Sequence, residues 1–398
     1  MVKIFKIKDA LEPMFVFMTY GIMFSTWFVY IPFVKIDLQI TQFQLAFAIF
    51  SMSAAGLIAL LFCPLIIKKL GSSNATKIII LAFTISIASL PFSRTYTDLC
   101  VRMFIVGLLA SSSNVAMNSL VLSIESKLNI NIMSTCHACF SLGCIIGSGI
   151  GSFVILVHLP KILHLLTLVI LLGTTILCGL KTSDRSTKQV ESNIEPQSQT
   201  VFSWIYVIKM LVPVMIIYFI MMSEGAMADW GGLYIRNIIA GPSWSYSLAY
   251  GMFSVAMCIG RFGGDKLANI FRTSVIIKTN LIIALSGLIL ILVKFLLISL
   301  LGFFLTGVGF SLLIPIVYRT ASQNTDAPSR AIAILSGAGS IGFLTGPLIF
   351  GFLGNWKGLT VSFVFILISV AFCFFLVLIE SRPKRSSNSL IPKANELI

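Results

Sequence analysis

A series of long apolar runs, separated by short polar segments, accounts for most of the chain. A helix needs roughly 20 consecutive apolar residues to cross the hydrocarbon core of a bilayer, and about twelve runs come close to or exceed that length. They are Leu11–Phe33, Phe43–Ile67, Ile78–Phe92, Leu99–Ile124, Ile132–Val157, Ile162–Leu180, Val201–Tyr234, Tyr246–Gly264, Val275–Val293, Phe295–Val317, Ala331–Leu353 and Leu359–Ile379. The pattern predicts an all-α polytopic membrane protein with twelve transmembrane helices.

The composition indicates a surface that is solvated by lipid. Hydrophobic residues make up 57% of the chain and charged residues only 11%, whereas a soluble domain carries about 25% charged residues. The formal net charge is +14, but the cations lie between the apolar runs and do not form one basic face. We therefore expect a lipid bilayer, and no nucleic acid, as the partner of this charge.

Lysine and arginine are distributed unequally between the two sides of the predicted bundle. An even number of spans puts both termini on one side, and most of the 28 Lys and Arg residues fall in segments on that side. The positive-inside rule assigns this side to the cytoplasm. We expect a multi-pass protein of a bacterial cytoplasmic (inner) membrane, with both termini in the cytoplasm.

The apolar runs form two sets of six that resemble each other. The polar segment 181–200 separates the sets, and its Ser, Thr and Gln content predicts a flexible cytoplasmic linker. Six-span repeats are typical of transporters with two rocking halves and a central site. We predict two pseudo-symmetric six-helix bundles at 1–180 and 201–380, followed by a cytoplasmic tail at 381–398. Three pairs of segments recur in order, roughly 200 residues apart: Leu45–Met52 with Leu248–Val255, Gly107 with Gly307, and Ser141–Gly147 with Ser340–Gly346.

Two short motifs resemble those of the major facilitator superfamily. The segment G-R-F-G-G-D, which contains Gly260, Arg261, Gly264 and Asp265, is similar to the family's loop between the second and third helices of a half. The segment from Arg102 to Gly107 is similar to its fourth-helix R-x-x-x-x-G motif. The resemblance implies that the first, fourth, seventh and tenth helices line a central cavity. It also implies that the G-R-F-G-G-D segment is a conformational loop.

A narrower resemblance points to the MosC-type subgroup, which is distantly related to the fucose permeases. It is carried by Asn114–Asn118, His137–Ser141, Glu224–Trp230 and Gly260–Asp265. This resemblance implies a sugar-like or inositol-like solute. An Asp is usual in the subgroup where this chain has Asn114, so one possible proton-carrying carboxylate is missing from the fourth helix.

Polar side chains on the helices expected to line the cavity are candidates for contact with a solute. Asn114 and Asn118 are four residues apart and share a helix face. Their amides can donate to and accept from a hydroxylated or zwitterionic solute, and the alternative role is hydrogen bonding between helices. The other candidates are Trp27, Tyr30, His137, Trp230 and Tyr318.

His137 lies between Cys136 and Cys139, a spacing that raises the question of a metal site. No second cluster of ligands accompanies it, so hydrogen bonding in the cavity or packing is the better interpretation. We expect neither a metal nor a cofactor.

Two acids lie inside the seventh apolar run, where a carboxylate is costly and indicates function. Glu224 is the main candidate for proton coupling, because burial disfavours the charged form and each half-cycle can expose the group to a different side. Asp229 is a second candidate, although pairing with Arg236, seven residues further on, is favoured slightly. Arg102 either binds an anionic solute or pairs with Asp98, and the pairing is favoured.

Together these features predict a secondary active transporter, not an enzyme, that moves a small polar solute by alternating access. We expect it to be a monomer coupled to protons. The alternative is a drug or siderophore efflux pump, whose wide apolar cavity would suit the 32 Phe and 15 Met. A polytopic membrane enzyme is a remote alternative, because the three histidines are spread between the fifth and sixth helices and no nucleophile–base pair stands out.

Overall fold

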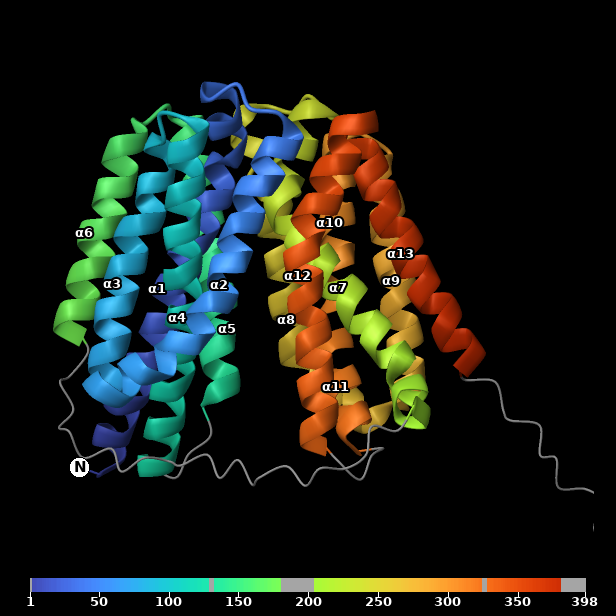
Figure 1. Ribbon diagram of the computed structural model, residues 1–398, viewed down its shortest axis with the longest axis horizontal. Coiled ribbons are helices and arrows are strands. Elements are labelled where there is room, and N and C mark those ends of the chain that lie inside the picture. The colour runs from blue at the N-terminus through green and yellow to red at the C-terminus, as the bar shows by residue number, and fades with distance from the viewer. Residues whose placement is uncertain (1, 129–131, 180–203, 324–327, 381–398) are drawn as a thin grey trace, which may run out of the picture.

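The computed structural model describes residues 2–128, 132–179, 204–323 and 328–380. Within these ranges the chain is helical and contains no strand, which confirms the all-α prediction (Figure 1). The short turns Leu90–Phe92 and Ser243–Ser245 are 3-10 helices, η1 and η2. The α-helices are α1 (Val2–Asp37), α2 (Gln42–Leu70), α3 (Ser72–Ser89), α4 (Tyr96–Leu128), α5 (Met133–Leu156), α6 (Lys161–Gly179), α7 (Trp204–Asn237), α8 (Leu248–Ile270), α9 (Thr273–Leu292), α10 (Leu296–Ser311), α11 (Leu313–Gln323), α12 (Pro328–Lys357) and α13 (Leu359–Glu380).

Twelve membrane-spanning segments follow from these helices, as predicted. Among the described residues, 10 segments are long and apolar enough to cross a bilayer, and one of them, Leu296–Gln323, consists of α10 and α11 together. The other two spans are α6, a shorter apolar helix, and α8, which has 23 residues. Large apolar side chains such as Phe62, Phe153 and Leu297 are exposed, as a surface that faces lipid requires.

The tenth span is broken at Leu312, which the sequence did not predict. Pro315 lacks a backbone N–H and its ring clashes with the carbonyl four residues earlier, which is that of Ser311. The helix therefore ends at Ser311 and a second helix, α11, begins at Leu313. This second helix carries Tyr318, one of the predicted solute contacts.

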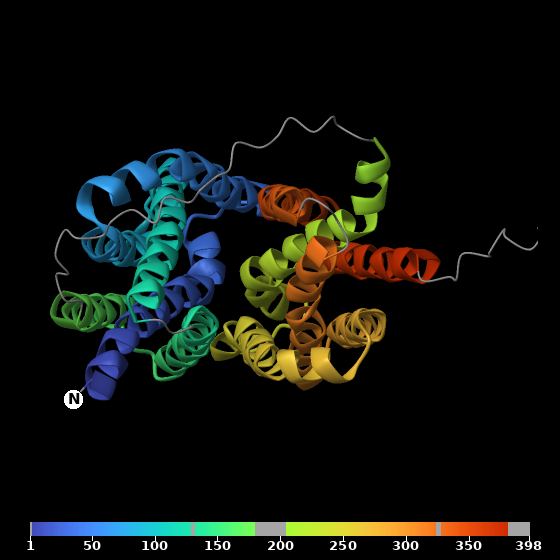
Figure 2. The same cartoon turned by 90° about the horizontal axis from the view of Figure 1, so that it is seen from below.

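The two sets of six spans form two bundles that lie side by side (Figure 2). The first bundle contains α1 to α6 and the second contains α7 to α13. The predicted linker 181–200 and the tail 381–398 lie outside the described residues, so the exact domain boundaries stay predictions.

Glycines that repeat in the sequence occupy matching places in the two bundles. A Cβ on Gly143 of α5 would meet the backbone of Met18 in α1, and a Cβ on Gly342 of α12 would meet the backbone of Tyr218 in α7. In the same way a Cβ on Gly107 would meet Met52, and one on Gly307 would meet Phe253. Each repeated glycine thus allows a close approach of the corresponding pair of helices. The packing confirms that the sequence repeat is a repeat of structure.

Contacts between the two bundles gather at one end of the molecule. We call the end where α1 begins the near end, and the opposite end, at the top of Figure 1, the far end. At the far end the Ser152 and Ser247 hydroxyls share a hydrogen bond between α5 and the start of α8. Nearby, Gly351 of α12 packs on Ala46 of α2, and Gly232 of α7 packs on Pro32 of α1. The bundles are therefore closed against each other at the far end.

Candidate functional site

A cleft of about 250 Å³ lies between α5 of the first bundle and α7 and α8 of the second. It contains one acid, one base, three hydroxyl groups and one thiol, surrounded by apolar side chains. Its lining residues are Phe140, Ser141, Cys144, Glu224, Tyr250, Phe253, Ser254, Met257 and Arg261. Because both bundles contribute to it, any relative movement of the bundles changes its shape.

Glu224 and Arg261 form an ion pair inside this cleft. The distance from Arg261 Nη2 to Glu224 Oε1 is 3.7 Å, which is longer than a hydrogen bond. The Glu224 side chain is 24% exposed and the Arg261 side chain 39% exposed, so a solute that enters the cleft can reach both groups. Glu224 is 13 residues from the end of α7, at roughly the mid-depth of the span.

Packing on either side of the ion pair holds its two helices in place. Gly225 has no side chain, so the ring of Phe343 in α12 lies against α7 immediately beside Glu224. Gly260 allows the Ser311 side chain of α10 to lie against α8. Neighbouring residues on a helix point about 100° apart, so the face of α8 that carries Arg261 is not the face that packs on α10. Glu224 and Arg261 are thereby left facing the cleft.

Tyr250 closes the cleft on the side of the far end. Its hydroxyl lies 3.9 Å from the Cys144 sulfur of α5, and its ring meets the ring of Phe28 in α1 edge to face, with centroids 4.6 Å apart. Both contacts join the first bundle to α8. A solute in the cleft is therefore separated from the far end by aromatic side chains from both bundles.

The start of α5 is fixed by a side chain of α4. Glu125 Oε1 accepts hydrogen bonds from the backbone N–H groups of Ile132 and Met133, at 2.5 and 2.8 Å. A carboxylate at a helix N-terminus satisfies donors that have no partner within the helix. This acid therefore has a structural role, which distinguishes it from Glu224.

Several predicted solute contacts lie on the near half of the molecule. Asn118 Nδ2 donates to Asn114 Oδ1 at 2.8 Å, which confirms that the two amides share a face of α4. The Tyr318 hydroxyl of α11 donates to Ser336 Oγ of α12 at 3.2 Å. His137 is exposed near the start of α5, and its ring stands edge to face against Phe17, with centroids 5.1 Å apart.

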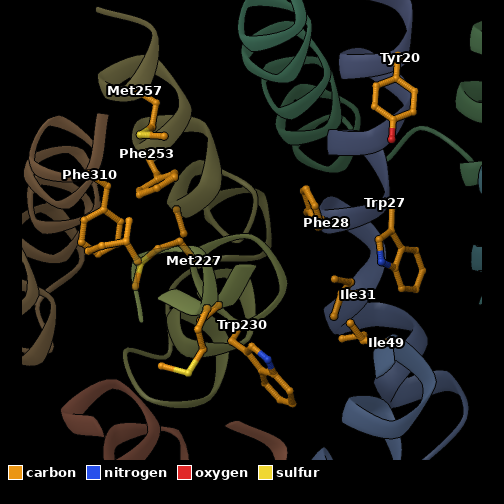
Figure 3. Close-up of a cluster of buried hydrophobic side chains, with 14 of the residues drawn as sticks. Tyr20, Trp27, Phe28, Ile31, Ile49, Met227, Trp230, Phe253, Met257 and Phe310 are labelled. Carbon is orange, nitrogen blue, oxygen red and sulfur yellow. The ribbon is translucent and has the colours of Figure 1, made fainter. Parts of the chain in front are cut away.

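Three other predicted contacts are buried away from the cleft. Trp27 of α1 and Trp230 of α7 are almost fully buried, and both belong to the apolar cluster shown in Figure 3. Tyr30 is buried too, and its hydroxyl is 2.8 Å from Nδ1 of His164 in α6. These positions do not fit contact with a solute in this conformation, because neighbouring side chains cover all three. The sequence gives the spacing along a helix but not which face meets the cavity.

Asp229 and Arg236 do not form the ion pair that their spacing suggested. Among the described residues Asp229 is buried and no cation lies within ion-pair distance of it, while Arg236 Nη1 donates to Asn237 Oδ1 at 3.3 Å. Seven residues rise about 10 Å along a helix, which is too far for a short aspartate to meet a side chain that points towards the helix end. The expectation of this pair was wrong.

The pairing expected for Arg102 is present. Its Nε donates to Asp98 Oδ1 at 2.7 Å, one turn earlier in α4, and its Nη1 donates to the carbonyl of Ser89. These contacts tie the start of α4 to the end of α3 at the far end. They fit the structural role of Arg102 better than contact with a solute in the cleft.

The G-R-F-G-G-D segment is helical where a loop was expected. It lies inside α8, which continues to Ile270, and the surroundings of Gly264 and the side chain of Asp265 are outside the described set. Arg261 consequently faces the cleft as the partner of Glu224, a contact that the sequence reasoning missed. The signal was available, because Arg261 is a cation inside the apolar run Tyr246–Gly264, where an ionisable residue is a functional candidate.

Comparisons with known proteins agree with this architecture. The sequence model of the Major Facilitator Superfamily matches residues 14–330 and 245–397. Membrane protein MosC of Rhizobium meliloti is 25% identical over 361 residues, which cover 89% of this chain and 85% of MosC.

Solved transporters share the fold. The crystal structure of a mutant of the nucleoside transporter NupG superposes with a TM-score of 0.75 at 10% identity, covering 95% of this chain and 100% of NupG. A D-xylose-proton symporter superposes with a TM-score of 0.72 at 11% identity, covering 95% of this chain and 97% of the symporter. Twelve spans in two similar bundles, a cleft between them and a family match over most of the chain lead to one conclusion: the chain is a multi-pass membrane protein that belongs to the Major Facilitator Superfamily of transporters.

Proposed function

We propose that this protein is a secondary active transporter that carries a small polar solute by alternating access, coupled to protons through Glu224. The observation that carries the proposal is the position of Glu224 in a cleft between the two bundles, paired only loosely with Arg261. The likeness in fold to a D-xylose-proton symporter supports proton coupling.

The distribution of cations orients the molecule. Most of the Lys and Arg residues outside the spans lie at the near end, so we place the near end and both termini in the cytoplasm, in a bacterial inner membrane. The far end then faces outwards, and its closed contacts make this an inward-facing conformation. Rocking the bundles apart at the far end would expose the Glu224 cleft to the opposite side of the membrane.

The physical reason for choosing Glu224 is its alternating environment. A carboxylate at mid-depth is charged when water and Arg261 stabilise it, and it takes up a proton when they are withdrawn. A carrier that reorients only when proton and solute are both bound, or when neither is bound, converts a proton gradient into a solute gradient. Asp229 lacks a position on the cleft, so we assign it a secondary role.

An efflux pump of the same fold is the second candidate. The cleft wall includes Phe140, Phe253 and Met257, and a broad apolar wall of this kind suits drug-like or siderophore-like compounds. Transport of a polar solute without any effect of apolar compounds would favour the first candidate.

We also expect the purified protein to be a monomer, which light scattering in detergent can measure.

The test is uptake into vesicles that contain the purified protein and a trapped pH-sensitive dye. D-Xylose, L-fucose, myo-inositol and uridine, together with a total small-metabolite extract, are added under an imposed pH gradient. We expect solute-dependent proton flux with the native protein, and its loss in Glu224→Gln, which still exchanges labelled solute across the membrane. Glu380→Gln, at the exposed end of α13, is the matched control and should behave as the native protein. Proton-driven accumulation that is unchanged in Glu224→Gln would contradict the proposal.

A further inference from the structure

Arg261 is a permanent cation at the centre of the proposed transport cleft. A guanidinium does not lose its proton in a protein, so its charge must always be balanced. Glu224 supplies that balance at 3.7 Å, without a hydrogen bond between the two atoms. We propose that the transported solute is a small anion whose carboxylate replaces Glu224 as the partner of Arg261 whenever Glu224 carries a proton. This inference rests on the proposed function and adds the class of solute to it.

Charge balance in the membrane gives the reason. If Glu224 takes up a proton, Arg261 remains charged at mid-depth without its counter-ion, and a cation inside a membrane span is costly unless it is paired. A neutral sugar cannot remove that cost. A carboxylate can, because it accepts two parallel N–H bonds from the guanidinium. Proton and anion should therefore bind together and leave together.

The groups around the ion pair agree with this exchange. Arg261 and Tyr250 from α8 and Cys144 from α5 lie close enough to Glu224 to interact with it electrostatically. From α12, Phe343 packs beside Glu224 and brings no charge. His137 of α5 faces Arg261 and adds no negative charge. Among the side chains that the structure describes, Glu224 is thus the carboxylate that Arg261 would lose on protonation.

The remaining lining groups suggest what else the anion carries. Ser141, Ser254 and Tyr250 line the cleft, and their hydroxyl oxygens can accept from a hydroxyl of a solute. A short hydroxylated carboxylate, such as a sugar acid, fits this set of partners.

A pair of cations lies at the far end of the same path. Gly232 packs on Pro32, and one turn beyond these residues Arg236 of α7 and Lys35 of α1 come near enough to repel each other. Both side chains are partly exposed where the bundles meet. Like charges on the two sides of a closing seam raise the local positive potential and attract anions. The approach to the cleft from this end therefore favours the same class of solute as Arg261.

The exchange sets the direction of the pH dependence. An anion that needs a protonated Glu224 binds tightly at low pH and weakens by up to about tenfold for each further unit of pH. In Glu224→Gln, which mimics the protonated form, binding should stay tight and lose this dependence on pH. A neutral solute would show no requirement for Arg261 in either case.

The experiment uses the full-length protein in vesicles with a trapped pH-sensitive dye. The probes are two pairs of solutes that share a hydroxylated carbon chain and differ in the carboxylate, D-gluconate with D-glucitol and D-galactonate with D-galactitol. A small-metabolite extract is also split on an anion-exchange resin into retained acids and unretained neutral compounds. We expect the acids, and not the neutral compounds, to drive proton flux. Arg261→Gln should abolish the flux, and Arg272→Gln, a matched change at the exposed start of α9, should preserve it.

The outcomes distinguish a failure of the anion assignment from a failure of the proposed function. Proton flux driven by the neutral fraction and retained in Arg261→Gln would overturn the anion assignment while the proposed function stood. Acid transport that is independent of pH in both the native protein and Glu224→Gln would overturn the proton coupling and, with it, this exchange. If neither the acid fraction nor the neutral fraction drives proton flux, both the proposed function and the anion assignment are overturned. If Arg261→Gln does not fold, Arg261→Lys tests the same step, because a lysine keeps the charge but loses the two-bond geometry and should weaken acid transport about tenfold.

Discussion

The closed far end rests on a glycine, and replacing it should shift the conformational equilibrium. A Cβ on Gly351 of α12 would overlap the Ala46 side chain of α2 and lie 3.1 Å from the carbonyl oxygen of Gln42. Carbon atoms in good contact are about 3.5–4.0 Å apart, so an alanine at this position forces α2 and α12 to separate in the closed state. The open state has no such contact and should be unaffected.

The size of the shift follows from the cost of overpacking. Inserting a methyl group into a close-packed contact costs about 1–3 kcal/mol, and here the cost falls only on the state closed at the far end. That difference changes the ratio of the two states about 5- to 150-fold in favour of the one open at the far end. Gly351→Ala should therefore deplete the conformation described above.

The measurement is the distance between spin labels attached at Thr97 and Lys294, exposed positions at the far ends of the two bundles. Double electron–electron resonance should show a longer distance gaining population in Gly351→Ala. Gly337→Ala, on the same helix but with open space around its Cβ position, is the control and should leave the distribution unchanged. Identical distributions for the native protein and Gly351→Ala would refute the argument that this contact holds the far end closed.

Three further predictions concern the packing within the first bundle. Tyr30→Phe removes the hydrogen bond to His164 and leaves a buried ring nitrogen without its partner. The free energy of unfolding, measured by thermal unfolding in detergent, should therefore fall by about 1–3 kcal/mol. An unchanged melting temperature would contradict the contact. Gly143→Val should lower the free energy of unfolding by about 1–3 kcal/mol, because its Cβ would meet the backbone of α1. Gly149→Val should be tolerated, because the space around its Cβ position is open. Equal effects of the two substitutions would count against the packing argument. Arg102→Gln should cost only about 0.3–0.5 kcal/mol from the loss of its helical partner Asp98 one turn away, and transport should persist; loss of transport with a folded protein would instead indicate a role in binding.

The sequence predicts the architecture well because the features that set it are long or repeated. Twelve apolar runs and glycines such as Gly143 and Gly342 depend only on composition and spacing, and both are confirmed by the packing. The break at Leu312 was not predicted because the apolar run continues through Pro315 without a change in composition, whereas the clash of the proline ring with the Ser311 carbonyl ends the helix. The orientation of Tyr30 and the partner of Arg261 could not be predicted, because each depends on which helix from elsewhere in the chain packs on that face.

Comparison of the two bundles separates residues that pack helices together from residues that occur only at the cleft. Met18 and Tyr218 hold matching places as the partners of Gly143 and Gly342, so Glu224, six residues after Tyr218, corresponds to Phe24.

Arg261 has an apolar counterpart as well. Gly56 and Gly260 both pack on a serine of the neighbouring helix, and the residues that follow Gly56, Leu57 and Ile58, are apolar where Arg261 follows Gly260. The small residues that let helices approach are repeated, while the two charges of the cleft occur in the second bundle alone. Charges inside a membrane are costly and are retained only where they serve a function, whereas packing constraints act equally on both bundles. Departures from the internal repeat, rather than the repeat itself, therefore point to the residues to which we assign transport in our proposal.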